Sequence, residues 1–158
     1  MAASAAAWPD KPITIIVGYA PGGANDVIAR FLAEKLQPVL KQPVIVDNKP
    51  GASGNISVSE AIKSPADGYT LLVAPISVQT ANPYLFKPAL NPERDLRPVA
   101  SLGFAQLYLV ARKDLPVRTA ADLVRLAKSA PGKLSYGSGG PGTQMHLVGE
   151  LFKQQAGV

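Results

Sequence analysis

Two glycine-rich segments carry the residue types that bind a small anion. The first, Gly18–Asp26, follows a short apolar run at Ile13–Val17 and passes directly into a helical pattern. Glycine lets the backbone turn without a Cβ in the way and leaves amide N–H groups open to a ligand. The helix that follows begins with unpaired N–H groups at the positive end of its dipole. A carboxylate is the simplest anion that such a turn can hold.

The second glycine-rich segment, Gly137–Thr143, also follows a short apolar run and precedes a helical pattern. A glycine turn ahead of a helix is often only a turn, but here the device occurs twice, without a sequence repeat. Polar side chains flank both turns: Tyr19 and Asn25 at the first, Ser138 and Thr143 at the second. Two such loops on two lobes can face each other across a cleft, which favours a binding site.

Catalytic and metal-binding patterns are weak in this sequence. The chain has no cysteine, which excludes disulfides, thiolate chemistry and cysteine-based zinc sites. His146 is the only histidine and no G-x-S-x-G elbow accompanies it, so capping or packing is favoured over catalysis. Gly18–Gly23 does not match G-x-G-x-x-G, and no Gly-Lys-Ser/Thr follows it. We therefore expect no catalytic residue, no metal and no cofactor.

The composition allows one packed domain, or one domain and part of a second. Of the 158 residues, 47% are hydrophobic and 17% are charged, so a core is expected. The formal charge of +5 comes from scattered basic residues, which favours anionic partners only weakly and argues against nucleic acid. No apolar run reaches the roughly 18 residues that span a bilayer.

The first part of the chain alternates predicted strands and helices. Strands are predicted at Ile13–Val17, Pro43–Asp47 and Tyr69–Ala74, and helices at Asn25–Leu40 and Asn55–Lys63. This order is typical of a doubly wound α/β sheet, in which right-handed crossovers bring the carboxyl ends of all strands to one edge. The segments expected at that edge are Gly18–Ala24, Asn48–Gly54 and Ala74–Thr80. The side chain of Asn25 or Asp26 is expected to cap the first helix.

A proline-rich connector, Asn82–Pro98, is expected to be extended. After it, strands are predicted at Leu107–Ala111 and Leu134–Tyr136. Helices are predicted from a capping box at Thr119–Asp122 to about Ser129, and over Gln144–Gln155.

These elements divide the chain into three parts. Residues 1–8 are assigned to a signal-peptide remnant, because Ala5–Ala7 suits a cleavage site, or to an arbitrary tail. Residues 9–98 form a first α/β lobe with its connector. Residues 99–158 begin a second α/β lobe.

Four motifs give the chain a family resemblance. They are Tyr19–Gly23 with Asp26 and Ala29–Arg30; Asn48–Ile56; Pro65–Leu72; and Tyr136–Thr143 with His146–Leu147 and Gly149–Phe152. In order and approximate spacing they resemble the Bug-type substrate-binding receptors of tripartite tricarboxylate transporters, over Trp8–Val158. The resemblance implies a type II periplasmic-binding-protein-like α/β fold whose two lobes close on a small mono- or dicarboxylate. It also implies a periplasmic location and delivery of the ligand to membrane permease subunits.

The resemblance also implies a set of ligand-binding residues, with ordered waters bridging some contacts. Asp26 has an alternative role as a charge that complements the helix dipole, and Tyr19 as a buried tyrosine at a strand end. The set is Tyr19, Ala20, Pro21, Gly22, Gly23, Ala24, Asp26, Ser77, Gln79, Ser138, Gly139, Gly140 and Thr143.

The chain departs from the resemblance in length, because family members are nearly twice as long. A first lobe that is nearly complete and a second that is partial are therefore expected, with exposed apolar surface that favours self-association. Two other functions stay open. One is a carboxylate sensor for a signalling partner, and the other is an enzyme that acts on an anionic substrate with His146 as acid–base.

Overall fold

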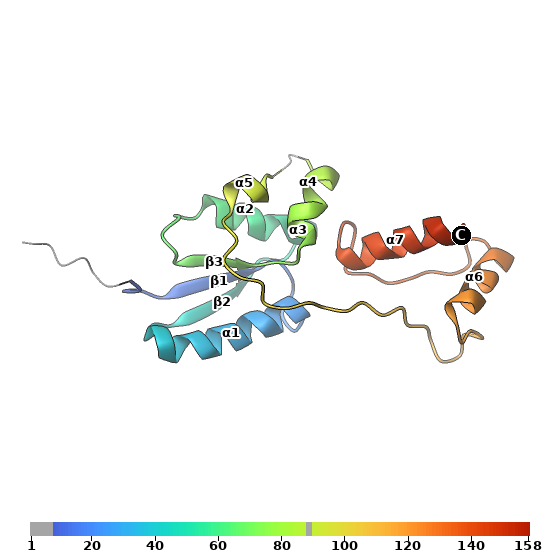
Figure 1. Ribbon diagram of the computed structural model, residues 1–158, viewed down its shortest axis with the longest axis horizontal. Coiled ribbons are helices and arrows are strands. Elements are labelled where there is room, and N and C mark those ends of the chain that lie inside the picture. The colour runs from blue at the N-terminus through green and yellow to red at the C-terminus, as the bar shows by residue number, and fades with distance from the viewer. Residues whose placement is uncertain (1–7, 88–89) are drawn as a thin grey trace, which may run out of the picture. The chain divides into compact units, whose positions relative to one another are not determined.

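Three parallel strands form the sheet of the first part of the chain (Figure 1). β1 (Ile13–Val17) lies in the centre, between β2 (Val44–Asn48) and β3 (Thr70–Val73). Val17 is in register with both Asn48 and Val73, so all three strands end at the same edge. The predicted strands and the predicted meeting of their carboxyl ends are confirmed.

The computed structural model describes residues 8–87 and 90–158. By its internal contacts the chain divides into two units, the first ending at Leu102 and the second spanning Gly103–Val158. Trp8 was assigned with the tail, but its ring packs on Tyr69 with the ring centroids 5.9 Å apart. The rest of that predicted tail, residues 1–7, lies outside the described residues.

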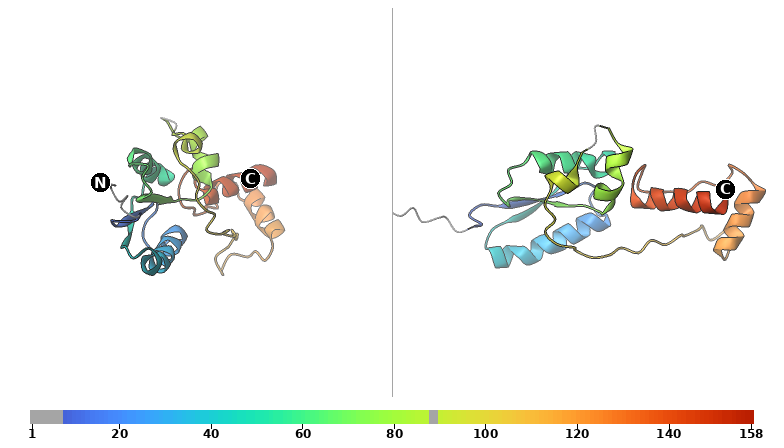
Figure 2. Two further views of the ribbon diagram at one scale, coloured as in Figure 1. Left: turned by 60° about the vertical axis from the view of Figure 1, so that its left-hand side comes forward. Right: turned by 45° about the horizontal axis from the view of Figure 1, so that its top comes forward.

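Two helices cover the sheet from opposite faces, as the views in Figures 1 and 2 agree. α1 (Ala24–Leu40) packs on β1 and β2, and α2 (Asn55–Lys63) packs on β3 and β1. The predicted helices are therefore confirmed to within one residue at each end. The buried core of the first unit comprises Ile13, Ile15, Val17, Ala29, Ala33, Val44 and Val73.

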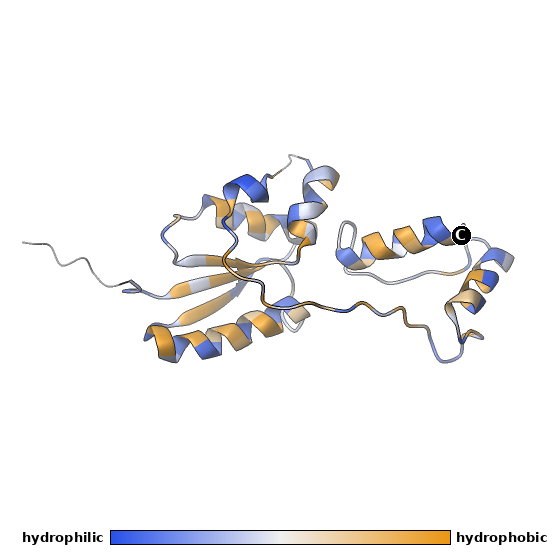
Figure 3. Cartoon of the chain, in the orientation of Figure 1, coloured by the Kyte–Doolittle hydropathy of each residue, from blue (hydrophilic) through white to orange (hydrophobic). Residues whose placement is uncertain are grey.

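The larger apolar side chains of α1 do not all face the sheet. Val27 and Phe31 are 58% and 61% exposed, whereas Ala29 and Ala33 face the sheet. The small alanine side chains allow the helix backbone to approach the strands closely, and Leu32 and Leu36 pack at the margin of the core. Apolar residues consequently run along the outside of α1 as well as along the strands (Figure 3).

The proline-rich connector is not simply extended, contrary to the prediction. Two short helices, α4 (Asn82–Leu85) and α5 (Pro92–Asp95), lie within it, and a third, α3 (Ser77–Thr80), lies just before it. Proline suits the first turn of a helix because its missing N–H would be unpaired there. Pro92 has this position in α5, and the side chain of Asn91 caps the same turn by accepting a hydrogen bond from the backbone N–H of Arg94. A further short helix, η1 (Ala52–Gly54), precedes α2.

The second unit contains α6 (Ala120–Ser129) and α7 (Gln144–Ala156), both close to the predicted bounds. The capping box at the start of α6 is confirmed. The strands predicted at Leu107–Ala111 and Leu134–Tyr136 are wrong, because residues 103–158 contain no strand. A strand needs a hydrogen-bonded neighbour, and these apolar runs find none within the unit.

No helix within residues 8–87 and 90–158 combines the length and apolar character needed to cross a membrane.

Gly18, at the end of β1, tests how tightly this edge of the sheet is packed. A Cβ at this position would lie 2.9 Å from the Cα of Gly54 and would also collide with the Ser57 hydroxyl. Gly18→Ala should lower the free energy of unfolding by about 1–3 kcal/mol, as overpacking of a core usually does. The measurement is urea unfolding followed by circular dichroism.

Gly137→Ala is the matched control, because nothing lies within 4 Å of the Cβ that it would add. It should change stability by less than about 0.5 kcal/mol. Equal stability of the Gly18→Ala variant and the natural chain would contradict the close packing described here.

Candidate functional site

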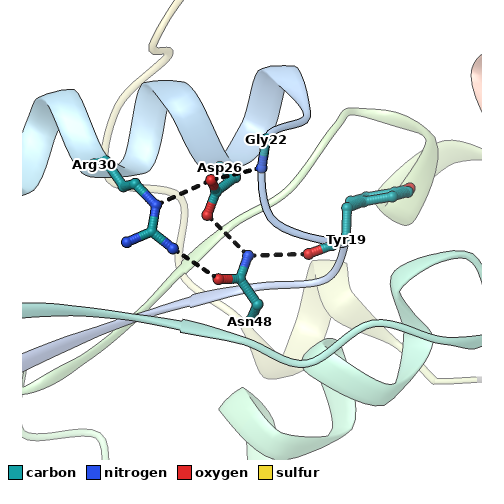
Figure 4. Close-up of polar contacts among 5 residues, drawn as sticks. All are labelled: Tyr19, Gly22, Asp26, Arg30 and Asn48. Carbon is teal, nitrogen blue, oxygen red and sulfur yellow. Dashed lines mark hydrogen bonds and ion pairs between the residues drawn. The ribbon is translucent and has the colours of Figure 1, made fainter.

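The turn between β1 and α1 is closed by the carboxylate of Asp26 (Figure 4). Its Oδ2 accepts hydrogen bonds from the backbone N–H of Gly22 at 2.9 Å and from Arg30 Nε at 3.0 Å. Its Oδ1 accepts a hydrogen bond from Asn48 Nδ2 at 2.9 Å, and that amide nitrogen also donates to the carbonyl of Tyr19 at 3.0 Å. Arg30 Nη2 donates in turn to Asn48 Oδ1 at 3.1 Å. One carboxylate thereby ties the loop, the helix and β2 together.

Asp26 is held in its charged form by this network. The side chain is 3% exposed, whereas its ion-pair partner Arg30 is 54% exposed. The hydrogen bonds from Arg30, then Gly22, then Asn48 lower the pKa of Asp26 to about 2. Both carboxylate oxygens of Asp26 point into the protein, and the guanidinium of Arg30 compensates their negative charge. The turn can therefore contain an aspartate and still attract an anion.

The start of α1 leaves backbone donors available. Gly23 is the N-cap residue, with φ −78° and ψ 167°, and no side chain caps it. The predicted cap by Asn25 or Asp26 is therefore wrong, because Asp26 is the third helical residue and reaches back to Gly22 instead. The first backbone bond of the helix runs from Val27 N–H to the Gly23 carbonyl at 3.0 Å. The N–H groups of Ala24 and Asn25 precede it and have no acceptor within the helix.

The loop around this turn is open on its outer side. Ala20, Pro21, Gly22, Gly23 and Ala24 are all exposed, whereas Tyr19 is partly buried. Gly22 has φ +88°, a backbone conformation that favours glycine. An exposed row of backbone atoms at a helix N-terminus is the geometry that the sequence predicts for anion binding.

The other two edge segments meet near the same turn. The hydroxyl of Tyr19 donates to the carbonyl of Ser53 at 3.3 Å, and Asn82 Nδ2 donates to the same carbonyl at 3.0 Å. Burial raises the pKa of the Tyr19 phenol. Gly54 lies between the Tyr19 hydroxyl and Val78 of α3, because a Cβ on Gly54 would lie 3.6 Å from each of them. The edge of the sheet is thus a single assembly of three loops.

Ser77 and Gln79 have different surroundings, although both lie on α3. Ser77 is buried, and its hydroxyl finds no hydrogen-bond partner within the described residues. Gln79 lines a hollow of about 380 Å³ together with Tyr84, Asn91 and Arg94. Only the Ser77 end of α3 is adjacent to the assembly at the sheet edge, through its neighbour Val78.

The predicted residues of the second unit gather in one turn before α7. Thr143 is the N-cap, and its hydroxyl donates to the carbonyl of Gly140 at 2.7 Å and accepts from the backbone N–H of His146 at 3.4 Å. The Ser138 hydroxyl accepts from the Gly140 N–H at 3.3 Å. Gly139 packs against the Thr143 side chain. Each unit therefore carries one of the two predicted loops in a defined conformation.

His146 has a role in the backbone of this turn. Its Nδ1 accepts a hydrogen bond from the backbone N–H of Gly142 at 3.4 Å. This contact agrees with the expected capping or packing role. Among the described residues, no three acidic or histidine side chains are placed to hold a metal ion together.

Sequence reasoning missed Asn48 and Arg30 as members of the site. Asn48 is the last residue of β2 and faces the Asp26 carboxylate across the sheet edge. An asparagine at the carboxyl end of a predicted parallel strand is a signal that points to this location. Arg30 lies four residues after Asp26, the spacing of an ion pair on one helix face.

Comparison with protein families gives one match that covers most of the chain. The model described as TctC, tripartite tricarboxylate transporter family receptor, matches residues 28–158. Among curated proteins, the UPF0065 protein in the gbd 5' region of Cupriavidus necator is 38% identical over 156 residues, which are 99% of this chain and 47% of that protein. Protein BugT of Bordetella pertussis is 39% identical over 157 residues, 98% of this chain and 48% of its own length. The chain thus spans about half the length of the curated relatives that it matches.

Solved structures show the same relationship. A structure described as R. palustris Rpa4515 with adipate has a TM-score of 0.82 and 34% identity, over 96% of this chain and 51% of that one. MatC (Rpa3494) from Rhodopseudomonas palustris, with bound malate, has a TM-score of 0.87 and 27% identity, over 96% and 52%. The periplasmic binding protein BugD has a TM-score of 0.76 and 28% identity, over 96% and 50%. The α/β fold of periplasmic solute-binding proteins is therefore confirmed for the part of the fold that this chain contains.

The Asp26 network makes a prediction about acid stability. The pKa of this carboxyl is about 2 in the folded chain and near 3.8 in its ordinary state, so its ionised form stabilises the fold. That stabilisation is complete above about pH 4 and is lost as the pH falls towards about 2. In Asp26→Asn this contribution should be absent, and the variant should be less stable than the natural chain at neutral pH. Urea unfolding at a series of pH values between about 2 and 6 measures both effects.

Asp47→Asn is the matched control on the neighbouring strand. Asp47 pairs with Lys49 at 3.2 Å, but both side chains are more than two-fifths exposed. Loss of such a surface pair should change stability by less than about 1 kcal/mol. The role given to Asp26 is contradicted if its substitution shifts stability by the same amount at every pH.

Proposed function

Because the chain belongs to the tripartite tricarboxylate transporter receptor family, we propose that it binds a small carboxylate in the periplasm, without catalysis, for delivery to a membrane permease. The observation that carries the proposal is the entrance of α1. There the N–H groups of Ala24 and Asn25, which have no acceptor within the helix, lie at the positive end of a helix of 17 residues. The adjoining carboxylate of Asp26 is turned inward and paired. An anion placed at this entrance meets donors and no uncompensated negative charge.

The residues of the first loop divide into two roles in this proposal. Tyr19, Ala20, Pro21, Gly22, Gly23 and Ala24 form the surface that receives one ligand carboxylate, directly or through water. Asp26 positions this surface and does not touch the ligand, because its charge would repel a carboxylate. Asn48 and Arg30 hold Asp26 in that role.

Ser138, Gly139, Gly140 and Thr143 of the second loop stay predicted ligand-binding residues of the second unit. Rpa4515 was solved with adipate and MatC with malate, which are dicarboxylates of different length and polarity. Backbone donors and bridging waters suit a family that accepts such different acids, because neither depends on one ligand shape. We therefore propose a dicarboxylate as the ligand class for this chain.

Titration of the isotope-labelled chain with adipate and with malate tests the proposal by NMR. The amide resonances of residues 19, 20 and 22–26 should shift and saturate, because the ligand carboxylate accepts hydrogen bonds from this turn. Adipamide, which lacks the charge, should leave them unchanged. The proposal fails if neither acid gives a saturable shift in these residues.

Ala24→Pro removes one donor from the entrance without disturbing the helix. Proline suits the first helical position, and the extended backbone of Gly23 before it is the conformation that a following proline requires. The variant should bind the acids roughly 10-fold or more weakly, the value of a hydrogen bond to a charged group.

Ala120→Pro is the matched control, since it removes the equivalent N–H at the start of α6, where Thr119 is also extended. It should bind as the natural chain does. Equal affinity of the Ala24→Pro variant would exclude the entrance of α1 as the anion site.

Self-association is a second part of the proposal. Phe104 and Tyr108 are 99% and 78% exposed, in an extended segment of the second unit that also exposes Val110. Exposed apolar patches of this kind favour contact between protein molecules. Light scattering should therefore give a mass above that of the monomer, and Phe104→Ser should lower it.

Tyr84→Ser is the control for that measurement, because Tyr84 is an aromatic residue of similar exposure in the first unit. It should leave the mass unchanged. A natural chain that is monomeric at every concentration and melts cooperatively would refute self-association.

A further inference from the structure

The entrances of α1 and α7 have the same backbone construction, residue by residue. In each, a glycine with positive φ, +88° at Gly22 and +81° at Gly142, precedes the N-cap residue. The third residue of each helix then accepts a hydrogen bond from that glycine's N–H: Asp26 in α1 and His146 in α7. The sequences share only Pro-Gly at these positions, so the repetition is visible in the conformation and not in the residue types.

The two acceptors differ in how they respond to pH. Asp26 is ionised at any pH well above 2, so its bond to Gly22 persists throughout the neutral range. A histidine nitrogen accepts a hydrogen bond only when it carries no proton. His146 therefore bonds Gly142 through Nδ1 as the neutral ring with its proton on Nε2.

We infer that His146 is the positioning residue of the second glycine loop, and that it holds Gly142 only in its neutral form. Protonation turns Nδ1 from an acceptor into a donor and places two N–H groups face to face. The loop that contains Ser138, Gly139 and Gly140 is then released at its Gly142 end, while the first loop stays closed. This inference goes beyond the proposed function and does not depend on it.

The titratable and charged groups on α7 and on the segments packed against it are Glu150, Lys153, Tyr136 and Lys128. Glu150 lies one turn further along α7, and contacts with the Tyr136 hydroxyl and Lys153, with a smaller effect of the His146 charge, lower the pKa of Glu150. Tyr136 comes from the segment that packs along α7, where its ring lies against Gly149. α6 contributes Lys128, which lies at the far end of α7 beside Gly157.

A protonated His146 thus has a carboxylate partner on its own helix. The Tyr136 hydroxyl donates to Glu150 Oε1 at 2.7 Å, and Lys153 Nζ lies 2.9 Å from Oε2, so Glu150 stays ionised beside the imidazolium. The charged ring can turn towards it when the bond to Gly142 is lost.

NMR of the chain without ligand tests the inference between about pH 5 and 8, the range in which histidine titrates. The Gly142 amide resonance should move with the same midpoint as the His146 ring nitrogens, and its protection from solvent exchange, taken relative to an unstructured amide at the same pH, should fall about fivefold in acid, the value of one ordinary hydrogen bond. The Gly22 amide is the internal control and should not change. A Gly142 resonance that stays constant while His146 titrates, or a Gly22 resonance that follows the same curve, would overturn the inference.

Two variants separate positioning from general packing. His146→Asp supplies the acceptor that α1 uses and should give a Gly142 amide whose protection, relative to an unstructured amide at the same pH, does not change with pH. His146→Ala should give a Gly142 amide with low protection at every pH. Thermal melting confirms that both are folded, and failure of His146→Asp to restore protection would show that the two entrances are not equivalent.

Discussion

One buried carboxylate organises the edge of the first unit at which the strands end. Asp26 accepts hydrogen bonds from the loop at Gly22, from its own helix at Arg30 and from β2 at Asn48. A buried charge is stable only when it is paired and hydrogen-bonded, so removing any one partner would leave the others strained or unpaired. The conformation of the exposed loop therefore depends on the buried side chain of Asp26.

This arrangement reconciles an acidic side chain with an anion-binding turn. The inward carboxylate satisfies the Gly22 N–H, which glycine's positive φ directs towards the helix, and the guanidinium of Arg30 balances its charge. The N–H groups of Ala24 and Asn25, at the first turn of α1, are not among the donors to Asp26. In the function that we propose, two roles are therefore separate although they lie within a few residues of each other: Asp26 fixes the turn, and the start of α1 receives an anion.

The first unit was largely predictable because its signals are local. Apolar runs of strand length and the three-four spacing of apolar residues located β1–β3, α1 and α2, and their order implied a parallel sheet. The role of Asp26 was not predictable in the same way, because its partner Asn48 is distant in sequence and meets it only when β2 aligns with β1. The strands expected at Leu107–Ala111 and Leu134–Tyr136 failed for the same reason: strand propensity is local, but a strand exists only with a neighbour.

The two glycine loops use different side chains for the same structural purpose. In both turns a glycine N–H needs a hydrogen-bond acceptor, and the third residue of the following helix, four positions later, supplies it. Aspartate meets that demand with a group whose charge is fixed over the neutral range, and histidine meets it with a group that changes protonation there. A similar backbone turn can therefore give one loop that is insensitive to pH and one that responds to it. The difference lies in a single side chain that composition and periodicity cannot distinguish from an ordinary packing residue.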